Sequence, residues 1–123
     1  MNIHESSEDY LERILILHEE QDKVIALDIA NSFGYSKASI SRAMKKLREN
    51  DYITISTDGN IELTSKGIKV AKKIYERHKL LTEMFERIGV TKEIALKDAC
   101  KIEHDLSDET FEAIKAHINK NNN

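Results

Sequence analysis

Cys100, Glu103 and His104 are three potential metal ligands in one short stretch of the chain. Spacings of three and four residues place side chains on one face of an α-helix, so a helix here would present a thiol, a carboxylate and an imidazole together. Mixed sulfur, oxygen and nitrogen donors suit a divalent transition ion. Each residue alone has an ordinary explanation, because a lone cysteine is usually a small buried residue and a Glu-His pair usually lies on the surface.

Three further donors lie on other segments expected to be helical. His78 falls on an otherwise apolar stripe, and Asp9 and Glu12 lie one helical turn apart near the N-terminus. Taken singly, His78 could be a core histidine, Asp9 a helix cap and Glu12 a surface residue. Together the donors come from three helices and match a five- or six-coordinate site for a divalent transition ion.

Hydrophobic periodicity predicts the elements that must position these residues. Helices are expected over residues 6–21, 26–33, 37–50, 65–88 and 92–106, with a sixth beginning after Ser107. The expected N-caps are Ser6, Ser36 and Thr91, and Gly34 and Gly89 are expected to end the second and fourth helices. Between the third and fourth helices, residues 52–56 and 61–64 alternate as strands around Asp58-Gly59, a strong hairpin signal.

Two helices joined by a tight turn at Gly34, followed directly by a hairpin, predict a winged helix-turn-helix. The expected fold is mainly α with a small β-hairpin: a winged helix-turn-helix over residues 1–65, then an all-helical module over residues 66–123 for dimerisation and metal binding.

The charged residues of the third predicted helix are almost all basic. From residue 36 to residue 48 it carries five cations and no acidic residue. We expect Arg42 to contact a base, because arginine pairs bidentately with guanine, and Lys37, Ser39 and Ser41 to contact phosphates. The candidate DNA-binding residues are Ser36, Lys37, Ser39, Ser41, Arg42, Lys45 and Lys46. The alternatives are a solvated basic face and a winged helix that binds protein instead of DNA.

Composition limits the class of protein. The chain has 123 residues, a formal net charge of −3, 40% hydrophobic residues and no proline. No apolar run approaches the length of a membrane span and no secretory signal is present, so we expect a cytoplasmic protein without a membrane partner. The single cysteine cannot form an internal disulfide.

Five motifs, in order along the chain, resemble the family of metal-dependent repressors that includes the diphtheria toxin repressor and the manganese transport regulator. They are residues 8–14 (EDYLERI), 28–30 (DIA), 63–67 (LTSKG), 77–81 (RHKLL) and 99–107 (ACKIEHDLS). The resemblance covers nearly the whole chain but not the C-terminal SH3-like domain of the longer members. It implies a homodimer that binds a palindromic operator when loaded with metal and represses genes for metal uptake.

The metal ligands implied by the resemblance are Asp9, Glu12, His78, Cys100, Glu103 and His104. Asp9 matches the manganese branch of the family and Cys100 the iron branch, so we expect Fe²⁺ or Mn²⁺, with Zn²⁺, Co²⁺ or Ni²⁺ as possible surrogates. Thr82 and Leu96 stand where the iron branch has the carboxylate and the histidine of an ancillary site.

The expected mechanism is that a cation neutralises the acidic ligands and fixes the spacing of two recognition helices at about one DNA turn, roughly 34 Å. The closest alternative is a winged-helix regulator that metal does not control. A metallohydrolase is disfavoured, because six protein donors leave no open position for water, and no small-molecule substrate is expected.

Overall fold

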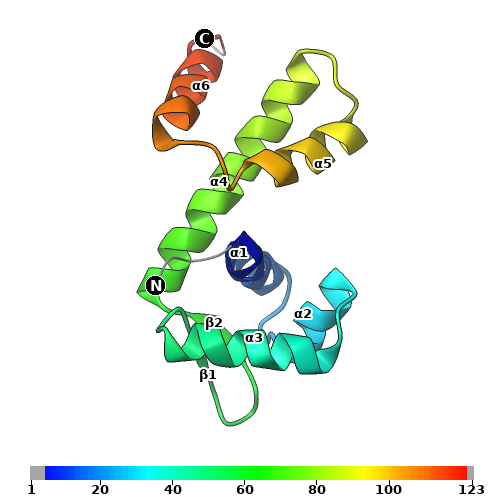
Figure 1. Cartoon of the computed structure of the whole chain (residues 1–123), viewed down its shortest axis with the longest axis vertical. Helices are drawn as coiled ribbons and strands as arrows, with labels where there is room; N and C mark the ends of the chain where they lie inside the picture. Colours follow the sequence, from blue (N-terminus) through cyan, green and yellow to red (C-terminus); the bar gives the residue numbers. More distant parts are fainter. Residues whose placement is uncertain (1–4, 122–123) are drawn as a thin grey trace. The chain divides into compact units, whose positions relative to one another are not determined.

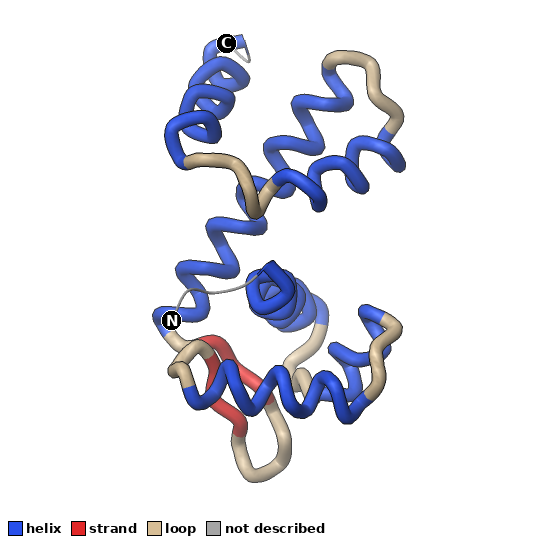
Figure 2. Tube along the Cα trace, in the orientation of Figure 1, coloured by secondary structure: helices blue, strands red, loops and turns tan. Residues whose placement is uncertain are grey.

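The computed structural model describes residues 5–121, which form six helices and one pair of strands (Figures 1 and 2). In chain order the elements are α1 (Glu5–Glu20), α2 (Ala26–Phe33), α3 (Lys37–Glu49), β1 (Ile53–Ile55), β2 (Ile61–Leu63), α4 (Ser65–Arg87), α5 (Lys92–Ile102) and α6 (Asp108–Asn121). The predicted fold class, mainly helical with one hairpin, is confirmed. No helix in this described range is long and apolar enough to cross a membrane.

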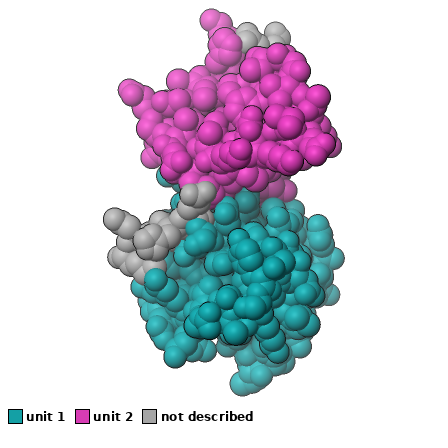
Figure 3. Space-filling view, turned by 45° about the vertical axis from the view of Figure 1, so that its right-hand side comes forward, with its two compact units in different colours: residues 1–73 teal, residues 74–123 magenta. Residues whose placement is uncertain are grey.

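The chain divides into two compact units, Met1–Lys73 and Ile74–Asn123 (Figure 3). The helix α4 contributes to both, and Ala71 in its second turn is fully buried in the core of the first unit. The division therefore falls inside α4, whereas the boundary predicted from the sequence lies at the start of this helix.

The first unit is a helix-turn-helix followed by a hairpin. Gly34 ends α2 with a left-handed backbone (φ 73°), a conformation that a side chain would disfavour, and lets the chain turn into α3. The strands β1 and β2 pair antiparallel, with Ile55 opposite Ile61. The core of this unit is built from apolar residues of every element: Leu11, Ile14, Val24, Ile29, Ala30, Ile40, Met44, Leu47, Tyr52, Ile53, Ile61 and Ala71.

Three predicted helix caps have different outcomes. The Ser36 hydroxyl caps α3 as expected, accepting a hydrogen bond from the Ser39 backbone N–H at 3.1 Å. Thr91 occupies the N-cap position of α5 but makes no side-chain capping bond. The cap predicted at Ser6 is wrong, because α1 begins at Glu5 and Ser6 lies within its first turn.

Candidate metal centre and nucleic-acid interface

The C-terminal end of α5 is shaped by Arg77, a buried residue of α4. Its guanidinium donates to the carbonyl oxygens of Glu103 at 3.0 Å and Leu106 at 2.6 Å, and pairs with the Asp108 carboxylate at 2.6 Å. These bonds fasten the segment after α5 to α4. The prediction that α5 continues to residue 106 is wrong, because the helix ends at Ile102; Arg77 satisfies the carbonyl groups of two residues in the segment that follows.

His78, the residue after Arg77, lies at the centre of a group of donors. Its Nδ1 atom is 2.9 Å from Glu103 Oε2 and 3.7 Å from Cys100 Sγ. One donor atom each from His78, Cys100 and Glu103 lies within 4.8 Å of the other two. An ion bound at about 2.0–2.3 Å from each donor separates neighbouring donors by roughly 3–4 Å, so small side-chain movements would let these three share one ion.

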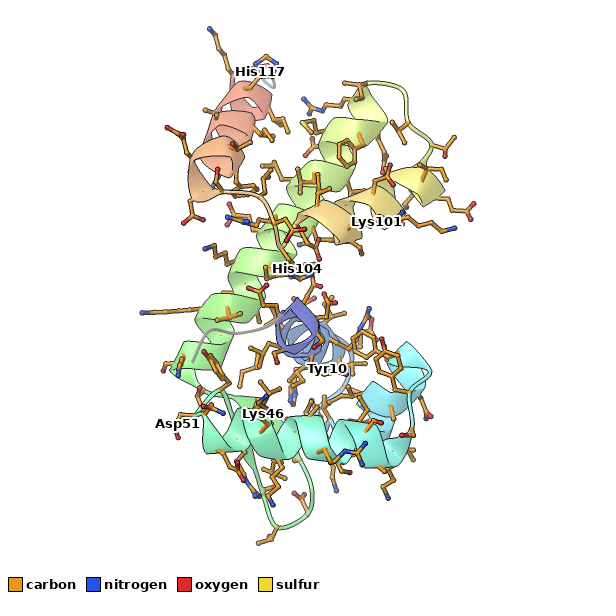
Figure 4. The ribbon with its side chains drawn as sticks, in the orientation of Figure 1. Tyr10, Lys46, Asp51, Lys101, His104 and His117 are labelled. Atoms are coloured by element: carbon orange, nitrogen blue, oxygen red, sulfur yellow. The ribbon has the colours of Figure 1, made fainter. Side chains whose placement is uncertain are left out.

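His104 extends this group from the turn that follows α5 (Figure 4). Its Nε2 atom is 3.5 Å from Glu103 Oε1, and its side chain is 3% exposed. We call His78, Cys100, Glu103 and His104 the donor cluster. All four belong to the second unit, where α4 and the end of α5 supply them.

Glu103 tests whether the donor cluster fits a cation. Its side chain is completely buried, and its Oε1 atom accepts no hydrogen bond from the described residues. A buried carboxylate is costly unless its oxygens meet donors or a positive charge. A divalent cation beside Oε1 would meet that need, and the thiol, imidazole and carboxylate groups present are ligands for transition ions. The donor cluster therefore fits a divalent transition metal.

Asp9 and Glu12, the two remaining predicted ligands, lie in the first unit. Both are half-buried on α1, one helical turn apart. The same helix buries Leu11 and Ile14 completely in the core of this unit. An interaction that fixes the carboxylates of α1 therefore also fixes a helix that packs in the core of the first unit.

Arg77 is a neighbour of the donor cluster that sequence reasoning missed. It lies three residues after Ile74 and four before Leu81, both buried, and its own side chain is 4% exposed. A cation at a buried position of an amphipathic helix is the signal that could have revealed it, because a buried arginine needs several acceptors.

The charged side of α3 is separated from its apolar side. Ile40, Met44 and Leu47 are buried at 0%, 1% and 1% exposure and attach the helix to the core. Of the predicted DNA-binding residues, Ser39 is half-buried, and the following are exposed: Ser36, Lys37, Ser41, Arg42, Lys45 and Lys46. The Arg42 guanidinium donates to Ser39 Oγ at 3.3 Å. The exposed side thus presents cations and hydroxyls, the groups that contact duplex DNA.

Comparisons with known proteins agree with both halves of this description. The model of the N-terminal DNA binding domain of iron dependent repressors matches residues 2–61, and the model of their metal binding and dimerisation domain matches residues 64–122. An uncharacterized HTH-type transcriptional regulator of Methanocaldococcus jannaschii is 36% identical over 118 residues, which cover 94% of each chain. The HTH-type transcriptional regulator MntR of Shouchella clausii is 36% identical over 109 residues, covering 89% of this chain and 76% of that protein.

A solved structure gives the same result in three dimensions. A manganese-dependent transcriptional repressor in complex with manganese superimposes with a TM-score of 0.83 at 29% identity, over 92% of this chain and 52% of that one. This chain therefore spans about half the length of that repressor. The matches to both domain models and to these regulators show that the chain belongs to the iron-dependent repressor family, a family of metal-dependent transcriptional repressors and not of enzymes.

Proposed function

We propose that this chain acts as a homodimeric repressor whose affinity for a palindromic operator is set by a divalent transition ion, and that it controls genes for metal uptake. The observation that carries the proposal is the donor cluster around buried Glu103, whose Oε1 atom accepts no hydrogen bond within the described residues. A regulator that does not respond to metal has no use for a buried carboxylate surrounded by a thiol and two imidazoles.

In this proposal the donor cluster holds the ion together with Asp9 and Glu12 of α1. The cation supplies the positive charge that lets several carboxylates share one site. The two α1 carboxylates would link metal binding to DNA binding, because α1 supplies Leu11 and Ile14 to the core that supports the helix-turn-helix. Ligands on this helix would favour one arrangement of the DNA-binding unit over others.

The ligand set favours Fe²⁺ or Mn²⁺. The Cys100 thiolate prefers Fe²⁺, Co²⁺, Ni²⁺ or Zn²⁺, whereas the carboxylates of Asp9, Glu12 and Glu103 suit the harder Mn²⁺. Zn²⁺, Co²⁺ and Ni²⁺ would serve as surrogates. Because thiolate and neutral imidazole are the binding forms, the affinity for metal falls in acid.

A second copy of the chain is the proposed protein partner. The second unit exposes three large apolar side chains, Ile88, Ile94 and Leu96, at 73%, 46% and 38%. Burying such side chains against a symmetry-related copy would be favourable. A two-fold dimer would offer two copies of α3 to two half-sites of double-stranded DNA, which is why the proposed operator is a palindrome.

The test is a DNA-binding titration of metal-free protein. A labelled duplex is first obtained by selection from a random-sequence library in the presence of protein and Mn²⁺. We expect Mn²⁺, or Fe²⁺ added without oxygen, to raise the affinity for this duplex at least tenfold, and a chelator to reverse the effect. Equal affinity for the selected duplex with and without every ion tested would leave a winged-helix regulator that metal does not control.

A further inference from the structure

The turn between α2 and α3 carries an exposed aromatic side chain that belongs to an aromatic cluster. Tyr35 is 54% exposed, yet its ring stacks on Phe33 with centroids 5.6 Å apart and an interplanar angle of 11°. Tyr10 of α1 meets both rings edge-on, at 5.3 Å from Phe33 and 6.5 Å from Tyr35. The left-handed backbone of Gly34 lies between the two stacked residues in the chain. The ring of Tyr35 is therefore held in place while much of it faces solvent.

The hydroxyl of Tyr35 is not used within the protein. It forms no hydrogen bond with any residue in the part of the chain that the structure describes, so the aromatic cluster fixes the ring without occupying its polar end. Packing against Phe33 and Tyr10 limits the motion of the ring, so a bond made by its hydroxyl would carry a small entropic cost. Such an arrangement suits a group that binds something outside the chain.

The surroundings of Tyr35 indicate what that partner is. Ser36, the next residue, caps α3, and exposed Lys37 begins the helix. No acidic residue occurs between residues 36 and 48, whereas five cations do. An anion is the ligand that these residues favour, and tyrosine hydroxyls are among the donors that contact DNA phosphates.

We propose that Tyr35 is a DNA-contacting residue whose hydroxyl donates a hydrogen bond to a backbone phosphate at the N-terminal end of α3. This inference rests on the proposed function. The contact positions the recognition helix on the duplex and carries no sequence information, so its contribution is the same for every sequence bound in the same register.

The test compares Tyr35→Phe with a matched control, Tyr10→Phe. Both variants keep their rings, so the aromatic cluster remains packed; Tyr35 is an exposed residue of the turn before α3, whereas Tyr10 is a half-buried residue of α1. Affinity is measured by fluorescence anisotropy with saturating Mn²⁺, on the selected duplex and on a scrambled duplex of equal length. We expect Tyr35→Phe to bind both duplexes about tenfold more weakly per half-site, as loss of a hydrogen bond to a charged group predicts.

Salt dependence separates the role of this hydroxyl from that of a cation. Tyrosine carries no charge, so Tyr35→Phe leaves the slope of log affinity against log salt unchanged. Lys37→Gln lowers that slope by about 0.9 for each phosphate that the lysine would neutralise. The affinity for Mn²⁺, measured by calorimetry, stays the same in Tyr35→Phe, because the hydroxyl acts on DNA and not on the donor cluster.

Each of the other possible outcomes contradicts the proposed Tyr35 contact in a different way. If the wild-type chain binds neither duplex with any metal, the proposed function and the Tyr35 contact both fall. If Tyr35→Phe binds both duplexes as tightly as the wild type, the contact falls and the proposed function stands. Loss of affinity on the selected duplex alone would make the hydroxyl a base reader instead. An equal loss in Tyr10→Phe would show that the cluster acts only by supporting the fold.

Discussion

Replacing Glu103 with glutamine removes a negative charge from the donor cluster while keeping the shape of the side chain. Because Glu103 is completely buried, the change affects two properties of the protein that can be measured separately. One is the stability of the metal-free protein, which bears the cost of a buried carboxylate. The other is the affinity for metal, which depends on that same charge. We expect Glu103→Gln to lower the second without lowering the first.

The effect on metal binding follows from linkage. For the wild type at a free Mn²⁺ concentration of 100 times Kd, binding stabilises the folded state by about 2.7 kcal/mol. Loss of an outer-shell partner alone weakens metal binding by roughly 10–100-fold, so loss of a charged ligand should weaken it by at least about 100-fold. At the same Mn²⁺ concentration the variant would gain only about 0.4 kcal/mol. At roughly 4 °C per kcal/mol, Mn²⁺ raises Tm by about 10 °C in the wild type and about 2 °C in Glu103→Gln.

The metal-free protein should respond differently. In Glu103→Gln the contact with His78 Nδ1, which is 2.9 Å from Glu103 Oε2, can remain a hydrogen bond but no longer involves a carboxylate. The change also removes the desolvation cost of a carboxylate whose Oε1 atom accepts no hydrogen bond within the described residues. Since these effects oppose each other, we expect the Tm of the metal-free variant to equal that of the wild type or to exceed it by up to about 4 °C.

The assay is scanning calorimetry of chelator-treated protein at one fixed protein concentration, with and without Mn²⁺. Glu112→Gln, an exposed carboxylate of α6 in the same unit, is the matched control and should reproduce the wild-type Mn²⁺ effect. If Mn²⁺ raised the Tm of Glu103→Gln as much as it raises that of the wild type, the buried carboxylate would not be a ligand. A fall of about 10 °C in its metal-free Tm would show that Glu103 is mainly a structural residue.

Three further changes test other parts of the molecule. Cys100→Glu replaces a soft donor with a hard one and should raise the affinity for Mn²⁺ relative to Fe²⁺ and Zn²⁺; an unchanged ranking in competitive titrations would contradict the assigned role of the thiol. Arg42→Ala should cost about 1–3 kcal/mol of operator-binding free energy per half-site and relax sequence preference at one position, with an unchanged circular dichroism spectrum. Full retention of specificity would exclude Arg42 as a residue that contacts a base. Hydrogen bonds to the Asp58 carboxylate from the Ser56 hydroxyl and the Asn60 backbone N–H, with Lys23 nearby, lower its pKa. The stability that this shift contributes is therefore present at neutral pH and lost as the pH falls through the lowered pKa. Ser56→Ala should raise the pKa of Asp58 in an NMR titration. An unchanged pKa would show that the Ser56 hydroxyl is not the main partner of the Asp58 carboxylate.

Much of the first unit could be predicted because its signals are local. The apolar positions of α3 recur at helical spacing, and Ile40, Met44 and Leu47 are buried as that spacing requires. Asp58-Gly59 marks the hairpin turn, and Gly34 ends α2 as predicted. The cap at Ser6 failed because a serine near an apolar run also fits inside the first turn, and no local signal distinguishes the two positions.

The donor cluster was predictable in composition but not in geometry. Spacing alone pointed to Cys100, Glu103 and His104, but assumed that one continuous helix carries all of them. The segment after α5 is held by Arg77, which is far away in the sequence, so a local pattern could not reveal these contacts. Tyr35 was missed for a related reason: an aromatic residue beside a turn suggests core packing, and only the structure shows its ring stacked on Phe33 while more than half of the residue stays exposed.

The energetics of Glu103 also give a reason why metal should act as a switch and not as a permanent part of the fold. An acid buried among imidazoles and a thiol carries a desolvation cost in the metal-free second unit that an uncharged side chain of the same shape would not. A bound cation would recover that free energy, and the recovered amount would appear as affinity for metal. Full satisfaction of Glu103 by fixed protein donors would leave less free energy to be gained from metal. The incomplete hydrogen bonding of this one carboxylate is therefore what allows a change in metal concentration to alter the stability of the unit.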